Sequence, residues 1–223
     1  MPPLTATKPA RGAALIRGVY AVTPDDDDTA RLADRVESCL AAGVRLLQYR
    51  HKSADAGLRR RQLEALVPRC ERHGCLLVVN DDWALASAMG LGAVHLGADD
   101  GDAARVRAAL GPDALIGVSC YASLERARDN APCADYLAFG SVFASPTKPQ
   151  APGAALGVLG AARSLGRPVV AIGGITATNA ADAIRAGADA VAVISALFSA
   201  PDPGAAARLL IGRCEAALQA AAR

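Results

Sequence analysis

Short apolar segments rich in β-branched residues alternate with longer Ala-, Leu- and Arg-rich segments from Val19 to the end of the chain. Eight such pairs follow one another, and this alternation is typical of strand and helix units around a parallel sheet. Because eight parallel strands close a barrel, the pattern predicts one (β/α)8 TIM barrel. The expected strands are residues 19–22, 44–49, 75–79, 93–96, 115–119, 135–140, 168–173 and 189–195.

The domain organisation follows from the length and from where the pattern begins. One α/β barrel can accommodate all 223 residues, and no Pro/Ser-rich linker divides them. The first residues contain several prolines and lack apolar periodicity, so we expect a disordered segment over 1–14 and the barrel over 15–223. Residues 144–155, rich in Pro and Gly, should form a loop over the site after the sixth strand.

Helix boundaries agree with this pattern. The four aspartates Asp25–Asp28 precede the first expected helix, which should end at Gly43. A metal cluster is the alternative for this acidic run, but we interpret it as helix capping and solvated surface, without a catalytic role. The seventh helix should run from Thr178 or Asn179 to Gly187.

Composition and charge argue against several classes of partner. The net charge is +2 and no basic run is present, which disfavours nucleic acid. No apolar run approaches the roughly 18 residues of a membrane span, and no secretory signal is recognisable. The six cysteines form no CxxC pair, so structural zinc is disfavoured and reduced thiols in the cytoplasm are expected.

Candidate diphosphate-binding side chains follow the second expected strand. Gln48, Arg50 and Lys52 alternate along the chain where this apolar strand ends. Arginine offers a planar fork of donors and lysine a compact charge, a combination that suits a diphosphate. An ordinary solvated strand end is an equally good interpretation of this segment alone.

Carboxylates follow the third and fourth expected strands. Asn80, Asp81 and Asp82 end the third strand, while Asp99 and Asp100 follow the fourth. Neighbouring strands lie about 5 Å apart, so Asp81 and Asp100 could share a Mg²⁺ ion, which prefers a few carboxylates with phosphate oxygens and water. Asp82 is better placed as a helix N-cap. The alternative is that all four aspartates only cap helices.

Hydroxyl groups and a further cation follow the fifth and sixth strands. Ser119 ends the fifth, and the loop after the sixth contains Ser145, Thr147 and Lys148. These groups could flank a phosphate, although loops rich in Ser, Thr and Pro are common without such a role.

The last two strands end in the segments that most strongly suggest phosphate binding. Gly173 and Gly174 follow the seventh strand, and Ile194 with Ser195 ends the eighth. Barrels of this class often bind phosphate there, because glycine lets backbone amides approach the anion. Plain turn glycines are the alternative. Within the strands, His95 is expected to be a buried, hydrogen-bonded histidine, and Trp83 a packing residue.

Taken in order, these segments resemble the thiamine phosphate synthase family. The shared pattern reads Gln-x-Arg-x-Lys, Asn-Asp, His-x-Gly-x-x-Asp, Gly-x-Ser, Asp-Tyr with a Thr-x-Thr-Lys-like loop, Gly-Gly-Ile and Ile-Ser. No single element is specific, but their order at successive strand ends spans nearly the whole barrel. The chain departs from the pattern at Tyr49 and His51, at Ser145 where threonine is usual, and at Cys120 and Tyr121.

The resemblance implies a transferase that joins a hydroxymethylpyrimidine diphosphate to a thiazole phosphate by a dissociative, Mg²⁺-dependent reaction. Its expected partners are these two small molecules, with a homo-oligomer left open. Arg50, Lys52, Ser119 and Lys148 would be catalytic. The pyrimidine diphosphate would be held by Gln48, Arg50, Lys52, Asn80, Ser119 and Lys148, the Mg²⁺ ion by Asp81 and Asp100, and the thiazole phosphate by Ser145, Thr147, Gly174, Ile194 and Ser195.

Three other functions fit parts of the pattern. A thiazole tautomerase on the same fold would need neither diphosphate nor metal, and its relatives typically have a histidine in the place of Tyr121. A sugar-phosphate isomerase or epimerase should show a paired acid and base on opposite strand ends. A phosphate-ligand sensor would keep Gly174 and lose the metal carboxylates. Retention of Asp81 and Asp100 favours the synthase.

Overall fold

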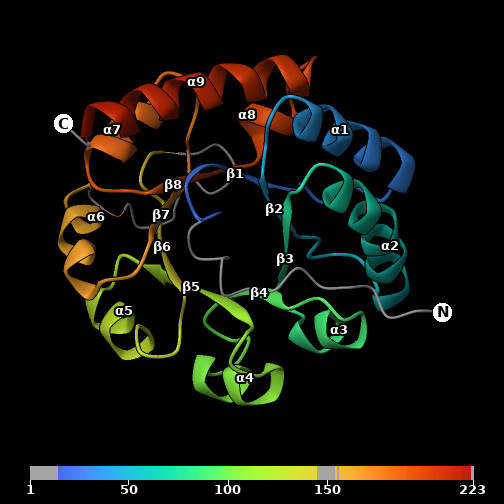
Figure 1. Cartoon of the computed structure of the whole chain (residues 1–223), viewed down its shortest axis with the longest axis horizontal. Coiled ribbons are helices and arrows are strands. Elements are labelled where there is room, and N and C mark those ends of the chain that lie inside the picture. Colours follow the sequence, from blue (N-terminus) through green and yellow to red (C-terminus); the bar gives the residue numbers. More distant parts are fainter. Residues whose placement is uncertain (1–14, 145–153, 155, 222–223) are drawn as a thin grey trace.

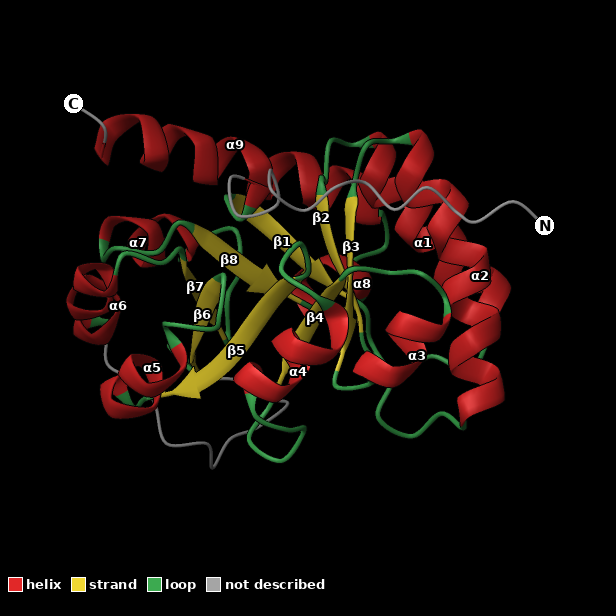
Figure 2. Ribbon diagram, turned by 60° about the horizontal axis from the view of Figure 1, so that its bottom comes forward, coloured by secondary structure: helices red, strands yellow, loops and turns green. Residues whose placement is uncertain are grey.

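A closed barrel of eight parallel strands, in the order β1 to β8, forms the centre of a computed structural model that describes residues 15–144, 154 and 156–221 (Figure 1). Helices surround the strands on the outside (Figure 2). The predicted (β/α)8 barrel is confirmed, with all eight strands close to their expected positions. They are β1 (Gly18–Val22), β2 (Leu46–Tyr49), β3 (Leu76–Asn80), β4 (Ala93–Leu96), β5 (Leu115–Tyr121), β6 (Tyr136–Gly140), β7 (Val169–Ile172) and β8 (Ala190–Val193).

The outer layer consists of helices between successive strands and a long helix at the end. That last helix, α9, lies beside α1 and α7 and covers the β8–β1 closure (Figure 1). The helices are α1 (Thr29–Ala41), α2 (Ala56–Arg72), α3 (Trp83–Ala88), α4 (Ala103–Leu110), α5 (Leu124–Asn130), α6 (Gly157–Ala162), the 3-10 helix η3 (Arg163–Leu165), α7 (Ala180–Arg185), α8 (Ser195–Phe198) and α9 (Pro203–Ala221).

The expected helix boundaries are confirmed for α1 and α7. The Asp28 carboxylate caps α1 by accepting hydrogen bonds from the backbone N–H groups of Ala30 and Arg31, each at 3.0 Å. Gly43 and Gly187 follow the two helices with positive φ angles, as chain reversal after a helix requires. The expected disordered segment 1–14 lies outside the described residues and stays a prediction.

Side chains of the strands divide between two apolar layers. Val94 and Leu96 face outward into the large core between barrel and helices, together with residues of the helices themselves. Leu46, Val78 and Leu115 face inward and belong to a smaller cluster inside the barrel. This alternation follows from the period of two along a strand, and it leaves the interior filled by side chains.

A missing side chain at Gly117 makes room for Tyr136, one of two tyrosines in the barrel interior. The ring of Tyr136, which is fully buried, occupies the space that a Cβ at residue 117 would need. Gly117 and Tyr136 are paired neighbours on β5 and β6. Glycine at this position is therefore a packing requirement of the interior.

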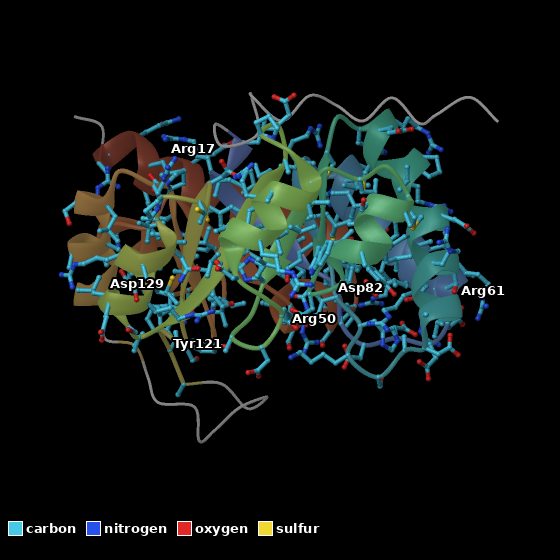
Figure 3. The ribbon with its side chains drawn as sticks, turned by 90° about the horizontal axis from the view of Figure 1, so that it is seen from below. Arg17, Arg50, Arg61, Asp82, Tyr121 and Asp129 are labelled. Carbon is cyan, nitrogen blue, oxygen red and sulfur yellow. The ribbon has the colours of Figure 1, made fainter. Side chains whose placement is uncertain are left out.

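A cavity lies at the amino-terminal end of the barrel. It has a volume of about 330 Å³, and its lining includes Arg17, Arg163, Arg167 and Asp189. Arg17 and Arg50 lie at opposite ends of the barrel (Figure 3), and none of the predicted site residues that the structure describes lines this cavity. Within the described residues, no helix combines the length and the apolar character needed to cross a membrane.

We expect Gly117→Ala to lower the free energy of unfolding by about 1–3 kcal/mol, because the new methyl group displaces Tyr136 from a full interior. Urea denaturation measures the change. Gly212→Ala is the matched control, because Gly212 lies in α9 with open space around it, and alanine there should stabilise by about 0.5–1 kcal/mol. Equal effects of the two substitutions would contradict the packing role of Gly117.

Candidate active site

Inward-facing polar residues meet at the carboxyl ends of the strands. Gln48 and Asn80 stand two residues after the interior apolar residues Leu46 on β2 and Val78 on β3, and Ser119 stands four residues after Leu115 on β5. They therefore share the interior face and cap the apolar layer below them. The structure thus brings together three residues that the sequence assigned to one site.

The carboxylates of Asp81 and Asp100 lie beside each other at the ends of β3 and β4. Asp100 Oδ2 accepts a hydrogen bond of 2.9 Å from the backbone N–H of Gly97. A Cβ at residue 97 would collide with this carboxylate and would lie 3.8 Å from Asp81 Oδ1. Glycine therefore leaves the space between the two carboxylates open.

Asp81 and Asp100 carry charges of the same sign, and both side chains are half-buried. Burial, followed by the neighbouring Asp100 carboxyl, raises the pKa of Asp81 well above its ordinary value. Lys52 and Arg50, which follow the neighbouring strand β2, act through their charges on the same carboxyl and lower its pKa. The ends of β2, β3 and β4 therefore form one charged cluster.

Backbone strain coincides with this cluster. Asp81 has a φ angle of 63°, a left-handed conformation that non-glycine residues rarely adopt. Tyr121, at an irregularity of β5, has a φ angle of 54°. Such outliers concentrate at functional sites, where the surrounding structure holds them in place.

The pair fits Mg²⁺ by the chemistry of its donors. Mg²⁺ is usually held by one or two carboxylates, with substrate phosphate oxygens and water completing six ligands. Among the described residues, no group of three or more His, Cys, Asp and Glu side chains could hold a metal ion. A metal at Asp81 and Asp100 would therefore depend on ligands from the substrate.

A continuous hydrogen-bonded chain crosses the barrel interior beneath the rim, by which we mean the carboxyl ends of the strands. Gln48 Nε2 donates to the Tyr20 hydroxyl at 2.9 Å, and the Tyr20 and Tyr136 hydroxyls are 2.8 Å apart. The Tyr136 hydroxyl lies 3.0 Å from His95 Nδ1, and His95 Nε2 lies 2.9 Å from Ser119 Oγ. The expectation that His95 is buried and hydrogen-bonded is confirmed.

The donor at Gln48 fixes the direction of this chain. Because an amide nitrogen only donates, Tyr20 must accept there and give its own proton to Tyr136. Tyr136 then donates to His95 Nδ1, so that His95 Nε2 carries the proton that it donates to Ser119. Burial lowers the pKa of His95 to about 4 and keeps the ring neutral. Ser119 accepts within the chain, so its own proton is available to a ligand.

The glycines after β7 have a packing role in addition to the expected anion contact. Gly174 has a φ angle of 64°, and a Cβ there would collide with the backbone carbonyls of Phe143 and Ala144. Asn179 Nδ2 donates to the Gly174 carbonyl at 2.9 Å and holds the turn. Close approach to the end of β6 thus explains Gly174, while its phosphate contact stays a prediction.

The other predicted site residues have mixed outcomes. Ile194 packs against the interior cluster at the end of β8, and Ser195 is exposed at the start of α8. Ser145, Thr147 and Lys148 lie outside the described residues, so their roles stay predictions.

Two neighbouring interpretations are confirmed. Asp82 caps α3 by accepting from the backbone N–H of Leu85 at 3.0 Å. Trp83 is half-buried against the outer core.

Three residues near the site were missed in the sequence. Tyr20 and Tyr136 are polar residues at inward strand positions, a signal that could have identified them as part of an interior chain. Arg126 donates to the carbonyls of Ser119 at 2.8 Å and Gly97 at 3.0 Å, which ties the ends of β5 and β4 together. No local pattern marks Arg126, because Gly97 lies 29 residues earlier and Ser119 belongs to the preceding strand rather than to the same helix.

Comparisons with known proteins agree in one family. A family model for thiamine monophosphate synthase matches residues 19–197. The thiamine-phosphate synthase of Chromobacterium violaceum is 54% identical over 198 residues, which cover 88% of this chain and 96% of that protein. That of Methylobacillus flagellatus is 53% identical over 194 residues, covering 86% and 93%. A solved thiamine phosphate pyrophosphorylase of Pyrococcus furiosus has a TM-score of 0.81 and 32% identity, covering 92% and 98%.

We expect Tyr136→Phe to destabilise the protein by about 1–3 kcal/mol, because it leaves buried polar groups of Tyr20 and His95 without their partner. Chemical denaturation measures the loss. Tyr121→Phe removes the same atom from an exposed tyrosine, whose hydroxyl has one hydrogen-bond partner among the described residues, the Ala98 N–H at 3.2 Å. If both substitutions lowered the free energy of unfolding by an equally small amount, the interior hydrogen-bonded chain would not stabilise the protein as proposed.

Proposed function

The chain belongs to the thiamine monophosphate synthase family and is a transferase of thiamine biosynthesis, and from this premise we propose which of its residues carry out the reaction. The substrates are a hydroxymethylpyrimidine diphosphate and a thiazole phosphate, and the products are thiamine phosphate and diphosphate. The site is the cluster at the carboxyl ends of β2 to β5, extended by the ends of β7 and β8.

One observation carries this assignment. Two carboxylates, Asp81 and Asp100, stand together at the ends of β3 and β4, and the two cations Arg50 and Lys52, which follow the neighbouring β2, act on Asp81 through their charges. Opposite charges at such a rim suit a ligand that brings both a metal ion and a polyphosphate. A diphosphate with Mg²⁺ has this composition.

The pyrimidine diphosphate would be held at the rim between β2 and β5. Arg50 and Lys52 pair with the diphosphate oxygens, and Ser119 donates the proton that its hydrogen-bonded chain leaves available. Gln48, whose amide nitrogen is engaged by Tyr20, can accept a hydrogen bond from the pyrimidine through its amide oxygen. Asn80 offers a further amide at the same level.

Asp81 and Asp100 would hold Mg²⁺ with the diphosphate. When bound, Mg²⁺ supplies positive charge that neutralises the departing diphosphate. The open space at Gly97 keeps both carboxylates accessible for this role.

The chemistry requires a cation-rich rim and no strong general base. The bond between the pyrimidine methylene and the diphosphate oxygen breaks, and its electron pair leaves with the diphosphate. Arg50, Lys52 and Lys148 stabilise the growing negative charge on that group. The thiazole nitrogen then donates its lone pair to the methylene carbon, forming the carbon–nitrogen bond. The new ring nitrogen becomes positively charged, so no proton has to be removed.

The thiazole phosphate would bind at the ends of β7 and β8. Gly174, Ile194 and Ser195 supply backbone and hydroxyl donors there, with Ser145 and Thr147 from the loop after β6. Holding the thiazole by its phosphate places its nitrogen next to the pyrimidine and makes the second step effectively unimolecular. We also propose a cytoplasmic location, which the free thiols of the six cysteines support, and assembly into a homo-oligomer.

An assay of the purified chain tests the proposal. The protein is incubated with both substrates, with and without Mg²⁺, and thiamine phosphate is measured by mass spectrometry. We expect product only when both substrates and Mg²⁺ are present. Isomerisation of the thiazole phosphate without diphosphate release would identify a tautomerase instead and contradict the proposed reaction.

We expect Asp81→Asn and Asp100→Asn each to lower kcat by roughly hundredfold, because each removes charge from the metal site. Steady-state kinetics at saturating Mg²⁺ measures the loss, and circular dichroism verifies folding. Asp99→Asn removes the same charge from an exposed neighbour and should leave kcat unchanged. Wild-type rates in folded Asp81→Asn or Asp100→Asn would remove the metal assignment.

A further inference from the structure

The acidic run Asp25–Asp28 between β1 and α1 does more than cap the helix. Asp28 alone makes the N-cap of α1, as expected. Asp25 and Asp27 instead contact the segment that follows β2, which carries the two candidate diphosphate-binding cations. The interpretation of the run as capping and solvated surface holds for Asp28 and for Asp27, whose side chain is 86% exposed, but it did not include the contacts of Asp25.

Asp25 contacts this segment twice through one oxygen. Its Oδ1 accepts a hydrogen bond of 2.9 Å from Arg50 Nη1 and one of 3.1 Å from the backbone N–H of Lys52. The Arg50 side chain is 23% exposed, which is low for an arginine at a rim. One carboxylate thus holds both the guanidinium of Arg50 and the main chain at Lys52.

The backbone around Arg50 is held by a second, buried contact from the end of β1. Thr23 Oγ1 accepts from the Arg50 N–H and donates to the Arg50 carbonyl, both at 2.8 Å. Because Thr23 is fully buried, this pair fixes the peptide while Asp25 fixes the side chain.

Further contacts attach the acidic run itself to β2 and α2. The Tyr49 hydroxyl donates to Gln62 Oε1 at 2.8 Å, and Gln62 Nε2 donates to the backbone carbonyl of Asp26 at 2.7 Å. His51 Nδ1 accepts from the Ala54 N–H at 3.1 Å, and its Nε2 lies 3.1 Å from an Asp27 carboxylate oxygen without forming a hydrogen bond. Tyr49, where the chain departs from its family pattern, thus helps to hold the run through Gln62.

We propose that Asp25 is a positioning residue for the transferase reaction, which holds Arg50 and the Lys52 main chain in the geometry that binds diphosphate. The inference rests on the proposed function, because it requires Arg50 to contact the diphosphate. Asp25 acts through Arg50 and needs no contact with substrate.

Whether removing Asp25 tightens or weakens diphosphate binding distinguishes a positioning role from charge repulsion alone. A carboxylate beside a diphosphate site repels the ligand, so removing it should tighten diphosphate binding by about fivefold if charge alone mattered. If Asp25 positions Arg50, removing Asp25 should instead weaken diphosphate binding, because a free Arg50 side chain must lose rotamer freedom when it binds. Asparagine at residue 25 keeps an acceptor oxygen but lacks the charge, so it distinguishes the two effects further.

Calorimetric titration of diphosphate with Mg²⁺, and the KM for the pyrimidine diphosphate, test the proposal. We expect Asp25→Ala to weaken diphosphate binding by about tenfold and to raise KM more than it lowers kcat. Asp25→Asn should restore much of the affinity. Tighter binding in both variants, or unchanged binding in folded Asp25→Ala, would overturn the proposal.

A matched control and a double variant complete the test. Asp28→Asn removes the same charge from the same run and keeps a good N-cap residue, so diphosphate affinity should equal that of the wild type. In an Arg50→Ala background, Asp25→Ala should cause only the smaller loss that follows from its contact with the Lys52 main chain, and an additional full tenfold loss would overturn the proposed route through Arg50. If Arg50→Ala alone binds diphosphate normally, the proposed role of Arg50 fails. If Arg50→Ala weakens diphosphate binding but Asp25→Ala does not, the positioning role of Asp25 is wrong while the proposed role of Arg50 stands.

Discussion

Strict alternation of side chains along strands that close into a ring is the constraint on which the rest of this structure depends. The period of two sends Val94 and Leu96 to the helices and His95 to the interior. Closure then brings the inward residues of all strands to one axis, and the parallel direction brings all carboxyl ends to one rim. Gln48, Asn80 and Ser119 meet for this reason, although long stretches of sequence separate them.

A polar chain inside an apolar barrel is costly unless every member has a partner, and here the partners are present. Gln48, Tyr20, Tyr136, His95 and Ser119 form a directed series in which each proton is assigned. Its two ends are candidate ligand-binding residues, so the same hydrogen bonds that satisfy the interior also orient the site. The space for Tyr136 comes from Gly117, which connects the packing of the interior to the orientation of Ser119.

The barrel and most strand-end residues could be predicted from the sequence, because apolar runs and their final polar residues are local signals. The contacts of Asp25 with Arg50 could not, since they join residues that come together only when β1 and β2 pair. The capping role of Asp28 was predicted correctly, but the acidic run was interpreted as a unit, so the separate role of Asp25 was not recognised. The inward strand positions of Tyr20 and Tyr136 could be predicted, but their hydrogen-bond partners could not, because those partners lie on other strands of the barrel. Gly174 shows why a glycine in a sequence is hard to interpret. A turn, close packing and contact with an anion each favour glycine, so the residue type alone does not tell them apart.

Metal and diphosphate should bind this chain as one unit, because the rim offers Mg²⁺ two carboxylates and leaves the remaining ligands to the substrate. The most direct measurement is calorimetric titration of diphosphate into the protein over a series of Mg²⁺ concentrations, repeated with Asp81→Asn. The wild type should bind diphosphate more tightly as Mg²⁺ increases, and Asp81→Asn should lose most of that gain. Diphosphate affinity that is independent of Mg²⁺, or a Mg²⁺ dependence that Asp81→Asn leaves intact, would contradict a shared metal and diphosphate site at this rim.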